Sequence, residues 1–533
     1  LRWLIASEQK DGVGVGRFAI VQIGDGAADA NGEARGSFVV GENISGPFTF
    51  ELKLLSDADG FGEVSIDLIP RGTILNPLPY TLDIRTETVI DGLGECGTSF
   101  VFVPDGRIFC TELKSGKVRV IENFQLLPEP LIQLEVYHTS DFPPDERGLT
   151  GITIDPEFEK NHYVYLHWTY WDSEDNEQYN RVARFTESNN KLNDMKILLG
   201  KIPAAAHHNG GPLEFGYDGK LYVTGGDAQG LFSPAGEQAQ NMNTSAGKIF
   251  RINSDGTIPE DNPFPGLPYY TLGHRNVFGI GFHPETGIAY VTENGPECCD
   301  ELNKLTPSKN YGWPYFAGRE RWYMNVAEDF LIGKEYHGPL MQFFSIIAPT
   351  ELTFYSGDRY IGENNNMFFL SFMHTQLYRV ILKPPNYDEV ESASVYSISL
   401  ESDKEGIFDS LFDIEQGPDG YLYVSSFRSI MRLDFIYSDL PTTILLESKS
   451  AVKTGETVGL KAAISDYFGN PVAGLPIEFF DSDKLIGSAI SNQDGIAEIE
   501  YSLEGMGQHI ITAKYAGGEK YLESSSAERI LPI

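Results

Sequence analysis

The sequence has no long hydrophobic run and a marked shortage of positive charge. Among its 533 residues, 40 are Lys or Arg and 76 are Asp or Glu, which gives a formal net charge of -36. Such a chain repels phosphate backbones and anionic headgroups, so nucleic acid is not expected as a partner. No apolar run reaches the roughly 18 to 20 residues that a membrane helix needs. These absences indicate a soluble chain, and an anchor outside this sequence is left open.

Cysteine is also scarce, with only Cys96, Cys110, Cys298 and Cys299 present. Four cysteines without CxxC spacing argue against a disulfide scaffold, a zinc ribbon and a haem attachment site. The adjacent Cys298 and Cys299 are either two buried thiols or a vicinal disulfide. The even count, the acidity and two glycosylation sequons, at Asn43 and Asn243, favour an extracellular or cell-surface location.

The chain does contain one sequence pattern that recurs along much of its length. An apolar strand is followed by a turn rich in Pro, Asp or Gly, and then by a second strand with alternating large residues. The copies are FVFVPDGRIFCTE (100–112), GITIDPEFEKNHYVYLHW (151–168), LEFGYDGKLYVTGGD (213–227), IGFHPETGIAYVTENG (280–295), LTFYSGDRYIGENNNMFFLSF (352–372) and FDIEQGPDGYLYVSS (412–426). Several are followed by a third strand with a basic residue among apolar ones, such as GKIFRI.

A β unit that recurs every several tens of residues, without helical periodicity, is typical of a β-propeller. The copies predict six blades between residues 87 and 438. In a propeller, residues that precede a first strand or follow a second one lie at one end of the central channel. His207-His208, Gly273 to Asn276 and Glu293 to Pro296 occupy such positions. We therefore expect them to converge on one face.

The flanks differ from this repeat. Residues 439–533 show short alternating strands about ten residues apart, with phrases such as GNPVAGLPIEFF and NQDGIAEIEYS, and resemble bacterial immunoglobulin-like domains. Such modules are spacers or adhesive units, so neighbours at a cell surface are expected partners. Residues 1–86 contain strand-like stretches and predict a small N-terminal β segment of unknown role. The predicted fold class is all-β: a six-bladed β-propeller with a C-terminal immunoglobulin-like β-sandwich.

The motifs in the repeat region resemble the soluble quinoprotein glucose/sorbosone dehydrogenases, including the aldose sugar dehydrogenases. The resemblance is carried by ERGLTGITIDPEF, HHNGGPLEFGYDGKLYVTGGD, GKIFRINSDGTIPEDNPF, LGHRNVFGIGFHP and ENGPECCDELN followed by NYGWP, over roughly 350 residues. Members of this family are six-bladed propellers that oxidise aldose sugars with pyrroloquinoline quinone (PQQ) and calcium. Non-catalytic animal relatives share the propeller.

The resemblance implies a catalytic set of His208, Arg275 and Asn276. His208 falls on the base that takes the proton of the anomeric hydroxyl, a role that imidazole chemistry suits near neutral pH. Arg275 and Asn276 fall on the pair that holds the quinone oxygens and the developing charge. Gly295 and Pro296 fall on the residues whose carbonyl oxygens bind calcium, which prefers oxygen ligands.

The sequence departs from the family at the cationic residues that neutralise the cofactor's carboxylates. Those positions hold Met373, Ser410 and Phe412, and none of these residues is charged. Glu146 stands where the sugar dehydrogenases have a glutamine beside the cofactor, and Pro212 stands where they have an arginine. Either other cations replace the missing ones, or the pocket holds a different ligand. The candidate replacements are Arg147, His374 and Arg428.

Two main functions follow from this pattern. The first is PQQ-dependent oxidation of an aldose sugar or related alcohol, with Glu146, Arg147, His208, Arg275, Asn276 and His374 around the cofactor and an external electron acceptor that the sequence does not identify. The second is a non-catalytic propeller that binds a ligand or a surface and keeps the calcium. A third, minor alternative is a transition-metal site, since imidazoles suit copper and zinc. Its candidate ligands are His138, His207, His208, His274 and His374.

Overall fold

The structure is a computed structural model. It describes residues 2–6, 21–22, 51–55, 80–93, 96–139, 145–228, 236–296, 299–318, 320–321, 336–343, 346–398, 400, 410–449, 453–505 and 507–532. The chain divides into two compact units, Leu1–Asn76 with Thr86–Asp434 and Pro77–Arg85 with Phe435–Ile533. Strands dominate both, and the helices among the described residues are one short α-helix and one 3-10 helix. Neither of these helices has the length and apolarity to span a bilayer.

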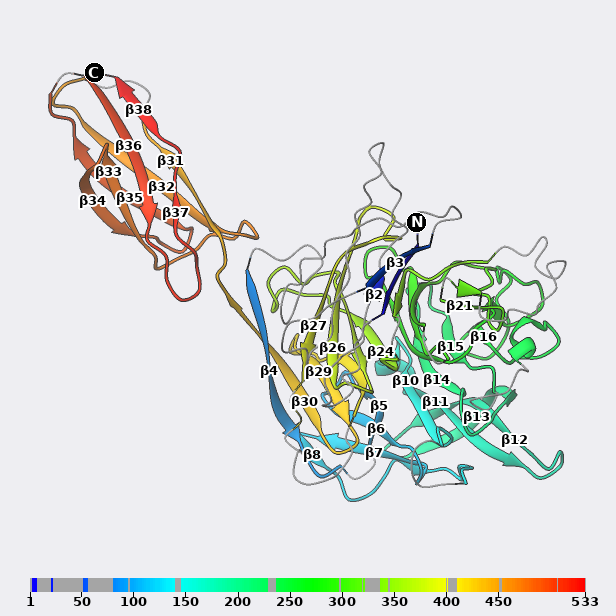
Figure 1. Cartoon of the computed structure of the whole chain (residues 1–533). Coiled ribbons are helices and arrows are strands. Elements are labelled where there is room, and N and C mark those ends of the chain that lie inside the picture. The colour runs from blue at the N-terminus through cyan, green and yellow to red at the C-terminus, as the bar shows by residue number, and fades with distance from the viewer. Residues whose placement is uncertain are drawn as a thin grey trace, which may run out of the picture. The chain divides into compact units, whose positions relative to one another are not determined.

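Six sheets of four or five strands make up most of the first unit (Figure 1). The first contains β5 (Cys96–Phe102), β6 (Ile108–Glu112), β7 (Lys117–Glu122), β8 (Gln125–Leu126) and β9 (Ile132–Gln133). The second contains β10 (Leu149–Ile154), β11 (Tyr163–Asp172), β12 (Glu177–Glu187) and β13 (Leu192–Pro203), with α1 (Phe158–Asn161) between its first two strands. The third contains β14 (Gly210–Phe215), β15 (Leu221–Gly225), β16 (Lys248–Ile252) and β17 (Tyr269–Leu272), with the 3-10 helix η1 (Gly236–Gln240) before β16.

The remaining three sheets follow the same antiparallel order. The fourth contains β18 (Val277–Phe282), β19 (Ala289–Glu293), β20 (Asp300–Lys304), β23 (Met341–Phe343) and β2 (Val21–Gln22). The fifth contains β24 (Pro349–Phe354), β25 (Met367–Ser371), β26 (Gln376–Leu382) and β27 (Val390–Ser397). The sixth contains β28 (Leu411–Gln416), β29 (Leu422–Ser426), β30 (Ile430–Ser438) and β4 (Thr81–Ile90). Two small pairs are β1 (Arg2–Ala6) with β3 (Glu51–Leu55) and β21 (Phe316–Ala317) with β22 (Glu320–Arg321).

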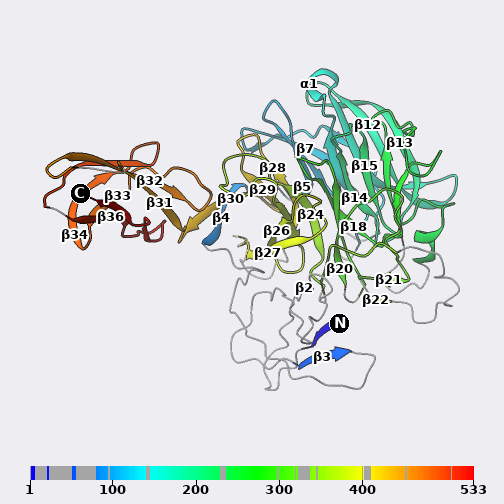
Figure 2. The same cartoon turned by 90° about the horizontal axis from the view of Figure 1, so that it is seen from above.

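The first strands of the six sheets form a closed ring. Neighbours contact one another in the order β5, β10, β14, β18, β24, β28 and back to β5. In Figure 2, first strands such as β14 and β18 lie at the middle of this unit, and outer strands such as β13 lie toward its margin. The sixth sheet combines three late strands with the early strand β4, so its pairing joins distant parts of the chain. β4 begins at Thr81 and crosses the predicted boundary at residue 86.

The repeated Asp-Gly turns explain why the sheets resemble one another. In each of three turns, the aspartate side chain accepts a hydrogen bond from the backbone N–H two residues later: Asp105 from Arg107, Asp218 from Lys220 and Asp419 from Tyr421. The glycine of each turn has a positive φ, which other residues adopt only with strain. The first two strands of these three sheets, the first, third and sixth, therefore meet at a tight hairpin.

Apolar residues of neighbouring sheets pack against each other between the faces. One such cluster joins Phe109 and Val118 of the first sheet to Leu166 and Ala183 of the second, all fully buried. Both faces of an inner strand are thus covered, which fits the continuous burial along β6, β15 and β29. This packing holds the strand ends, where the polar residues of interest lie, in fixed positions.

The second unit has its own two sheets and its own core. One sheet contains β31 (Thr442–Glu447), β32 (Thr457–Asp466) and β35 (Ile496–Ser502). The other contains β34 (Lys484–Ile490), β33 (Pro476–Asp481), β36 (Gln508–Tyr515), β37 (Ser524–Ser525) and β38 (Arg529–Pro532). Alternating residues of β32 are buried, and they pack with Ile477 and Phe479 into a single apolar cluster. The strands therefore show the period-two pattern of two sheets packed on one core.

The cysteines are only partly described. Cys110 and Cys299 are buried and disulfide-bonded, and no described cysteine is a free thiol. Cys298 and the side chain of Cys96 lie outside the described residues. The proposed vicinal bond between Cys298 and Cys299 therefore stays a prediction.

Candidate functional site

A cavity of about 350 Å³ lies among residues that precede first strands or follow second strands. Its lining includes His208, Arg275, Asn276, Gly295 and Pro296, which were predicted to converge, and Glu146, which was predicted to bind the cofactor. They come from three successive sheets, because Glu146 precedes β10, His208 precedes β14 and Arg275 precedes β18. Since the first strands of these sheets are neighbours in the ring, their preceding residues meet at one place.

His208 is held by a carboxylate that follows the second strand of its own sheet. The imidazole Nδ1 lies 2.8 Å from Asp227 Oδ1, and Asp227 Oδ2 accepts a hydrogen bond of 2.6 Å from the indole N–H of Trp313. Gly226 permits this contact, because a Cβ there would lie 2.0 Å from the His208 carbonyl oxygen. An ionised aspartate can only accept, so Nδ1 carries the proton and the lone pair is on Nε2.

Nε2 of His208 has no hydrogen-bond partner among the described residues, and His208 lines the cavity although its ring is almost fully buried. His208 also has a left-handed backbone, with φ of 60°. A histidine that lines a cavity, with Nδ1 fixed by a carboxylate and Nε2 without a partner, is arranged to accept a proton from a bound molecule. This arrangement is what general-base catalysis requires.

Glu146, which precedes β10, contacts residues that precede β14 and β18. Its Oε2 accepts the His208 backbone N–H at 2.7 Å and lies 3.4 Å from the Asn276 side-chain nitrogen. The Asn276 side-chain oxygen accepts the Gly210 N–H at 3.3 Å. His207 is near the same carboxylate, with Nδ1 3.8 Å from Glu146 Oε1. Glu146 and Asn276 therefore fix the backbone of His208 as well as lining the cavity.

Arg275 is a buried cation with spare donor capacity. Its Nη1 donates to the Asn294 carbonyl oxygen at 2.9 Å, its guanidinium lies 5.4 Å from the centre of the Trp313 ring, and its Nε has no partner. Burial lowers the pKa of Arg275, against the nearby charges of Asp227 and Asp300. A buried guanidinium donor without an acceptor is costly, so it points to an acceptor on a ligand.

The predicted calcium loop is anchored by one carboxylate. Asp300 Oδ1 accepts the Gly295 N–H at 2.7 Å, and Oδ2 accepts the N–H groups of Ile347 and Ala348, each at 2.8 Å. Burial raises the pKa of Asp300 to about 7, against the opposing effect of these three hydrogen bonds. Gly295 and Pro296 line the cavity, and Asp300 fixes the backbone on which their carbonyl oxygens lie.

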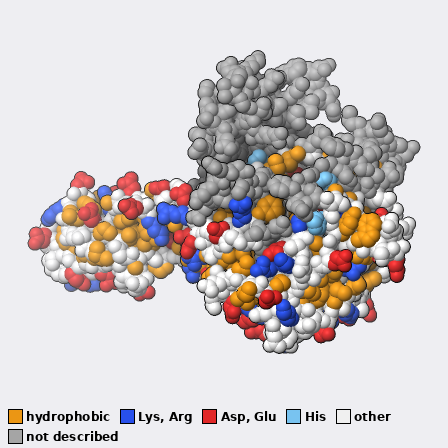
Figure 3. Space-filling model, turned by 90° about the horizontal axis from the view of Figure 1, so that it is seen from below, with side chains coloured by type: hydrophobic (Ala, Val, Ile, Leu, Met, Phe, Trp, Pro, Cys, Tyr) orange, Lys and Arg blue, Asp and Glu red, His pale blue; other side chains and the backbone are white. Residues whose placement is uncertain are grey.

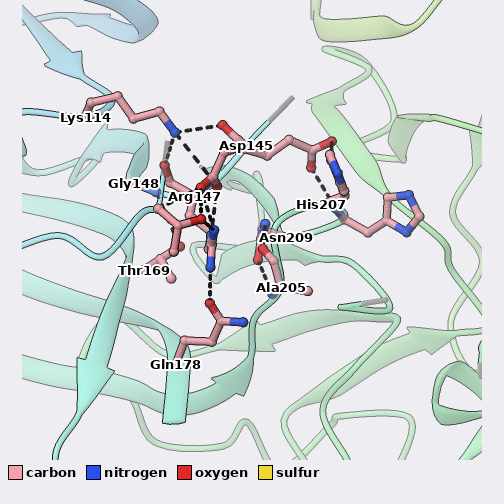
Figure 4. Close-up of polar contacts among 12 residues, drawn as sticks. Lys114, Asp145, Arg147, Gly148, Thr169, Gln178, Ala205, His207 and Asn209 are labelled. Carbon is pink, nitrogen blue, oxygen red and sulfur yellow. Dashed lines mark hydrogen bonds and ion pairs between the residues drawn. The ribbon is translucent and has the colours of Figure 1, made fainter. Parts of the chain in front are cut away.

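Two of the predicted cofactor-binding residues are placed elsewhere. Arg147 does not line the cavity, because its guanidinium is paired with Asp145 at 2.5 Å and bonded to Gln178 (Figure 4). His374 is also absent from the described lining, and its N–H donates to Ser371 Oγ at 3.2 Å. Arg428, a candidate replacement cation, follows the lining residue Phe427 without lining the cavity itself. These assignments stay predictions, and the lining of the cavity does not support them.

The wall opposite the polar group is apolar. It comes from the fifth and sixth sheets, at the ends of β25 and β29 and the start of β28. Phe412 packs edge-on against Phe372 and Phe427, with ring centres 5.4 Å and 4.3 Å apart. Met373 follows Phe372 and is 43% exposed. Of the positions where family members have cations, Met373 and Phe412 line the cavity, and Ser410 is fully buried and does not.

The histidine metal site is not supported. Among the residues that the structure describes, no group of three His, Cys, Asp or Glu side chains could hold a metal ion. His274 is fully buried, with Nδ1 2.8 Å from Glu293 Oε2 and Nε2 2.8 Å from Thr271 Oγ1. Both ring nitrogens of His274 therefore already have hydrogen-bond partners within the protein.

Sequence reasoning missed Asp227, Trp313 and the phenylalanine wall. Asp227 is the last residue of the HHNGG…TGGD motif, and the position after a second strand was itself a signal for the cavity end of the ring. Trp313, from NYGWP, is far along the sequence from both of its partners. No local pattern reveals such a contact.

Comparison with known proteins identifies the family. Residues 95–430 match the model of the family described as glucose/sorbosone dehydrogenase, which is more than half of the chain. The chain belongs to the glucose/sorbosone dehydrogenase family. It is 30% identical to an uncharacterised protein of Synechocystis sp. over 361 residues, which cover 64% of this chain and 84% of that protein.

Two further relatives have names that state an activity. Quinoprotein glucose dehydrogenase B of Acinetobacter calcoaceticus is 35% identical over 242 residues, or 40% of this chain and 49% of that protein. The solved structure of the PQQ-bound aldose sugar dehydrogenase of Streptomyces coelicolor is 23% identical and has a TM-score of 0.53, covering 67% of this chain and 99% of that one. The second likeness concerns the fold, and the family's fold is a β-propeller.

Proposed function

We propose that this chain is a sugar-dehydrogenase-like oxidoreductase of its family, acting on a hydroxyl group of an aldose sugar or related alcohol. The observation that carries the proposal is the pairing of His208 with Asp227 at the cavity, which leaves Nε2 as a base. His208 takes the proton of the substrate hydroxyl. Arg275 and Asn276 offer donors to the oxygen atoms of the bound reactants. The six sheets are, in this proposal, the six blades of the propeller.

The described residues do not fit the carboxylates of PQQ. Arg275 is the only Lys or Arg among the described residues that line the cavity, whereas Asp145, Glu146, Asp300 and Glu351 are acidic. Burial and the neighbouring charge of Asp413 raise the pKa of Glu351 well above its ordinary value. An unpaired carboxylate in a partly dry pocket is unfavourable. We therefore assign no step to PQQ.

Calcium remains part of the proposal. The carbonyl oxygens of Gly295 and Pro296 are its proposed ligands, and Asp300 holds the loop through backbone N–H groups without offering a free oxygen of its own. Calcium bound to the folded state raises the free energy of unfolding through mass action, by about 2.7 kcal/mol at 100 times its dissociation constant, and so raises the unfolding temperature. A thermal melt with calcium, against magnesium as control, tests this point.

A second candidate function is ligand binding without redox chemistry. The phenylalanine wall, which includes Phe412 at a position where the family has a cation, favours it. In the same proposal the second unit is an immunoglobulin-like module that contacts neighbours at a cell surface, and the chain is extracellular. The acidic balance of the sequence supports that location.

Aldose-dependent reduction of a redox dye separates the two functions. We expect the purified chain, supplied with calcium and a panel of quinones that includes PQQ, to reduce the dye when an aldose is added. His208→Ala should lower kcat by roughly 100-fold or more, since general-base catalysis contributes about 10²–10⁴-fold. His207→Ala is the matched control and should keep most of the activity. No turnover with any aldose and quinone would favour the binding function instead.

A further inference from the structure

The two halves of the cavity wall have different chemistry, and the sheet order explains why. The polar half comes from the approaches to β10, β14 and β18, with Glu146, His208 and Arg275. The apolar half comes from the fifth and sixth sheets, which follow next in the ring. A ligand that fills the cavity therefore meets polar groups of the second to fourth sheets along one edge, and phenylalanine rings next to Thr350 and Glu351 on the other. Hydrophobic and histidine side chains also lie close together on the face shown in Figure 3.

The apolar half of the cavity wall contains three phenylalanine rings that pack against one another. Phe412 lies between Phe372 and Phe427 with both neighbouring rings edge-on to it, at interplanar angles of 76° and 69°. All three rings line the cavity and are half-buried. Half-buried aromatic rings beside a cavity are suited to stack on, or meet edge-on, a planar ring.

The polar half limits the charge of the ligand. Arg275 offers one guanidinium, of which Nε is buried without an acceptor. Four carboxyl groups line the same cavity, and those of Glu146 and Glu351 come from different sheets. One guanidinium suits one acceptor oxygen on the ligand and cannot pair with several carboxylates at once.

We propose that the cavity binds a planar ring compound that is uncharged and carries its oxygen atoms along one edge, the class to which carboxylate-free ortho-quinones belong. This inference rests on the proposed function in that it names the cofactor class of the same cavity. The ligand's oxygen accepts from Arg275 and Asn276, and its ring lies against the Phe372, Phe412 and Phe427 wall. The carboxylate-bearing quinone of relatives is then the weaker ligand.

A matched pair of probes tests the charge directly. PQQ and its trimethyl ester share the ring and the quinone oxygens and differ in charge, and 9,10-phenanthrenequinone is an uncharged ortho-quinone with both oxygens on one edge. Titration calorimetry on the full chain, without sugar and with calcium present, should give the ester a dissociation constant about tenfold or more below that of PQQ. The phenanthrenequinone should bind as well.

Substitutions that place a cation at the phenylalanine wall should reverse the preference for the ester over PQQ. Phe412→Arg and Met373→Lys should each tighten PQQ by about tenfold and weaken the uncharged probes, because a cation is placed where the ring lies. Phe412→Leu is the control: it keeps the wall apolar and should leave the preference for the ester unchanged. Thermal melts of each variant confirm that it is folded.

The outcomes separate this inference from the proposed function, since binding is measured without turnover. Tighter binding of PQQ than of its ester by the wild-type chain would overturn the inference, as would the absence of binding by any uncharged quinone. Sugar oxidation with PQQ alone would leave the dehydrogenase function standing and remove the inference. Binding of the ester without sugar oxidation would support the inference about the ligand and contradict the proposed dehydrogenase function.

Discussion

Two histidine–carboxylate pairs occupy similar places in successive sheets, each joining a residue ahead of a first strand to a carboxylate at or after the end of a second strand. His208 precedes β14 and pairs with Asp227 after β15, and His274 precedes β18 and pairs with Glu293 at the end of β19. Both pairs join Nδ1 to a carboxylate oxygen at 2.8 Å. The difference is at Nε2, which has no partner among the described residues in the cavity-lining His208 and contacts Thr271 Oγ1 in His274.

The comparison shows how one local pattern serves two purposes. His274 is fully buried, stacks on Tyr311 at 4.6 Å and holds Glu293, which also accepts the Arg275 backbone N–H. The second pair therefore positions the backbone of Arg275, whereas the first presents a base. A carboxylate-held histidine becomes chemically useful only where its far nitrogen meets a cavity.

The largest effect on folding is expected from removing the buried imidazole. His274→Ala leaves Glu293 buried without its partner and should lower the free energy of unfolding by roughly 3–5 kcal/mol. His208→Ala should cost less, because water from the cavity can replace the ring at Asp227. Denaturant unfolding of both variants measures the difference. Equal losses would remove the distinction between the two pairs.

The carboxylate of the first pair should affect turnover more than folding. Asp227→Asn keeps the hydrogen-bond geometry but allows the other tautomer of His208, so we expect kcat to fall by roughly 10–100-fold. Glu293→Gln is the corresponding change in the second pair and should alter kcat by less than about threefold. Steady-state dye reduction compares them. A larger loss for Glu293→Gln would mean that the pairs exchange roles.

The smallest expected effect is on the pH dependence of stability. It concerns Glu301, which shares the hydrogen-bond donor Asn303 with Glu293 of the second pair. Burial and the charge of Glu293 raise the pKa of Glu301 from 4.5 to about 8. The folded carboxyl then keeps its proton where the unfolded one has lost it, so the free energy of unfolding falls as pH rises from about 4.5 to 8. Glu301→Gln should flatten this decline by on the order of 2 kcal/mol. Unfolding measured at pH 5 and pH 8.5 gives the change, and an unaltered slope would contradict it.

Much of the architecture could be predicted because it is encoded in local patterns. The alternating strands and Asp-Gly turns predict the repeating sheets, and the position of His208 before a first strand predicts its place at the cavity. Side-chain partners could not be predicted in the same way. Arg147 pairs with Asp145, two residues earlier, and this ion pair removes it from the cavity although its position in the chain is favourable. The opposing phenylalanine wall depends on contacts between different sheets.

The difference between the two imidazoles can be measured directly by their reactivity. Diethyl pyrocarbonate attacks an available imidazole nitrogen, and peptide mass spectrometry locates the modified histidines in the folded chain. The account predicts modification of His208 with parallel loss of dye reduction, protection of His208 by a bound quinone, and no modification of His274. Modification of His274 at the same rate, or modification of His208 without loss of activity, would contradict the account.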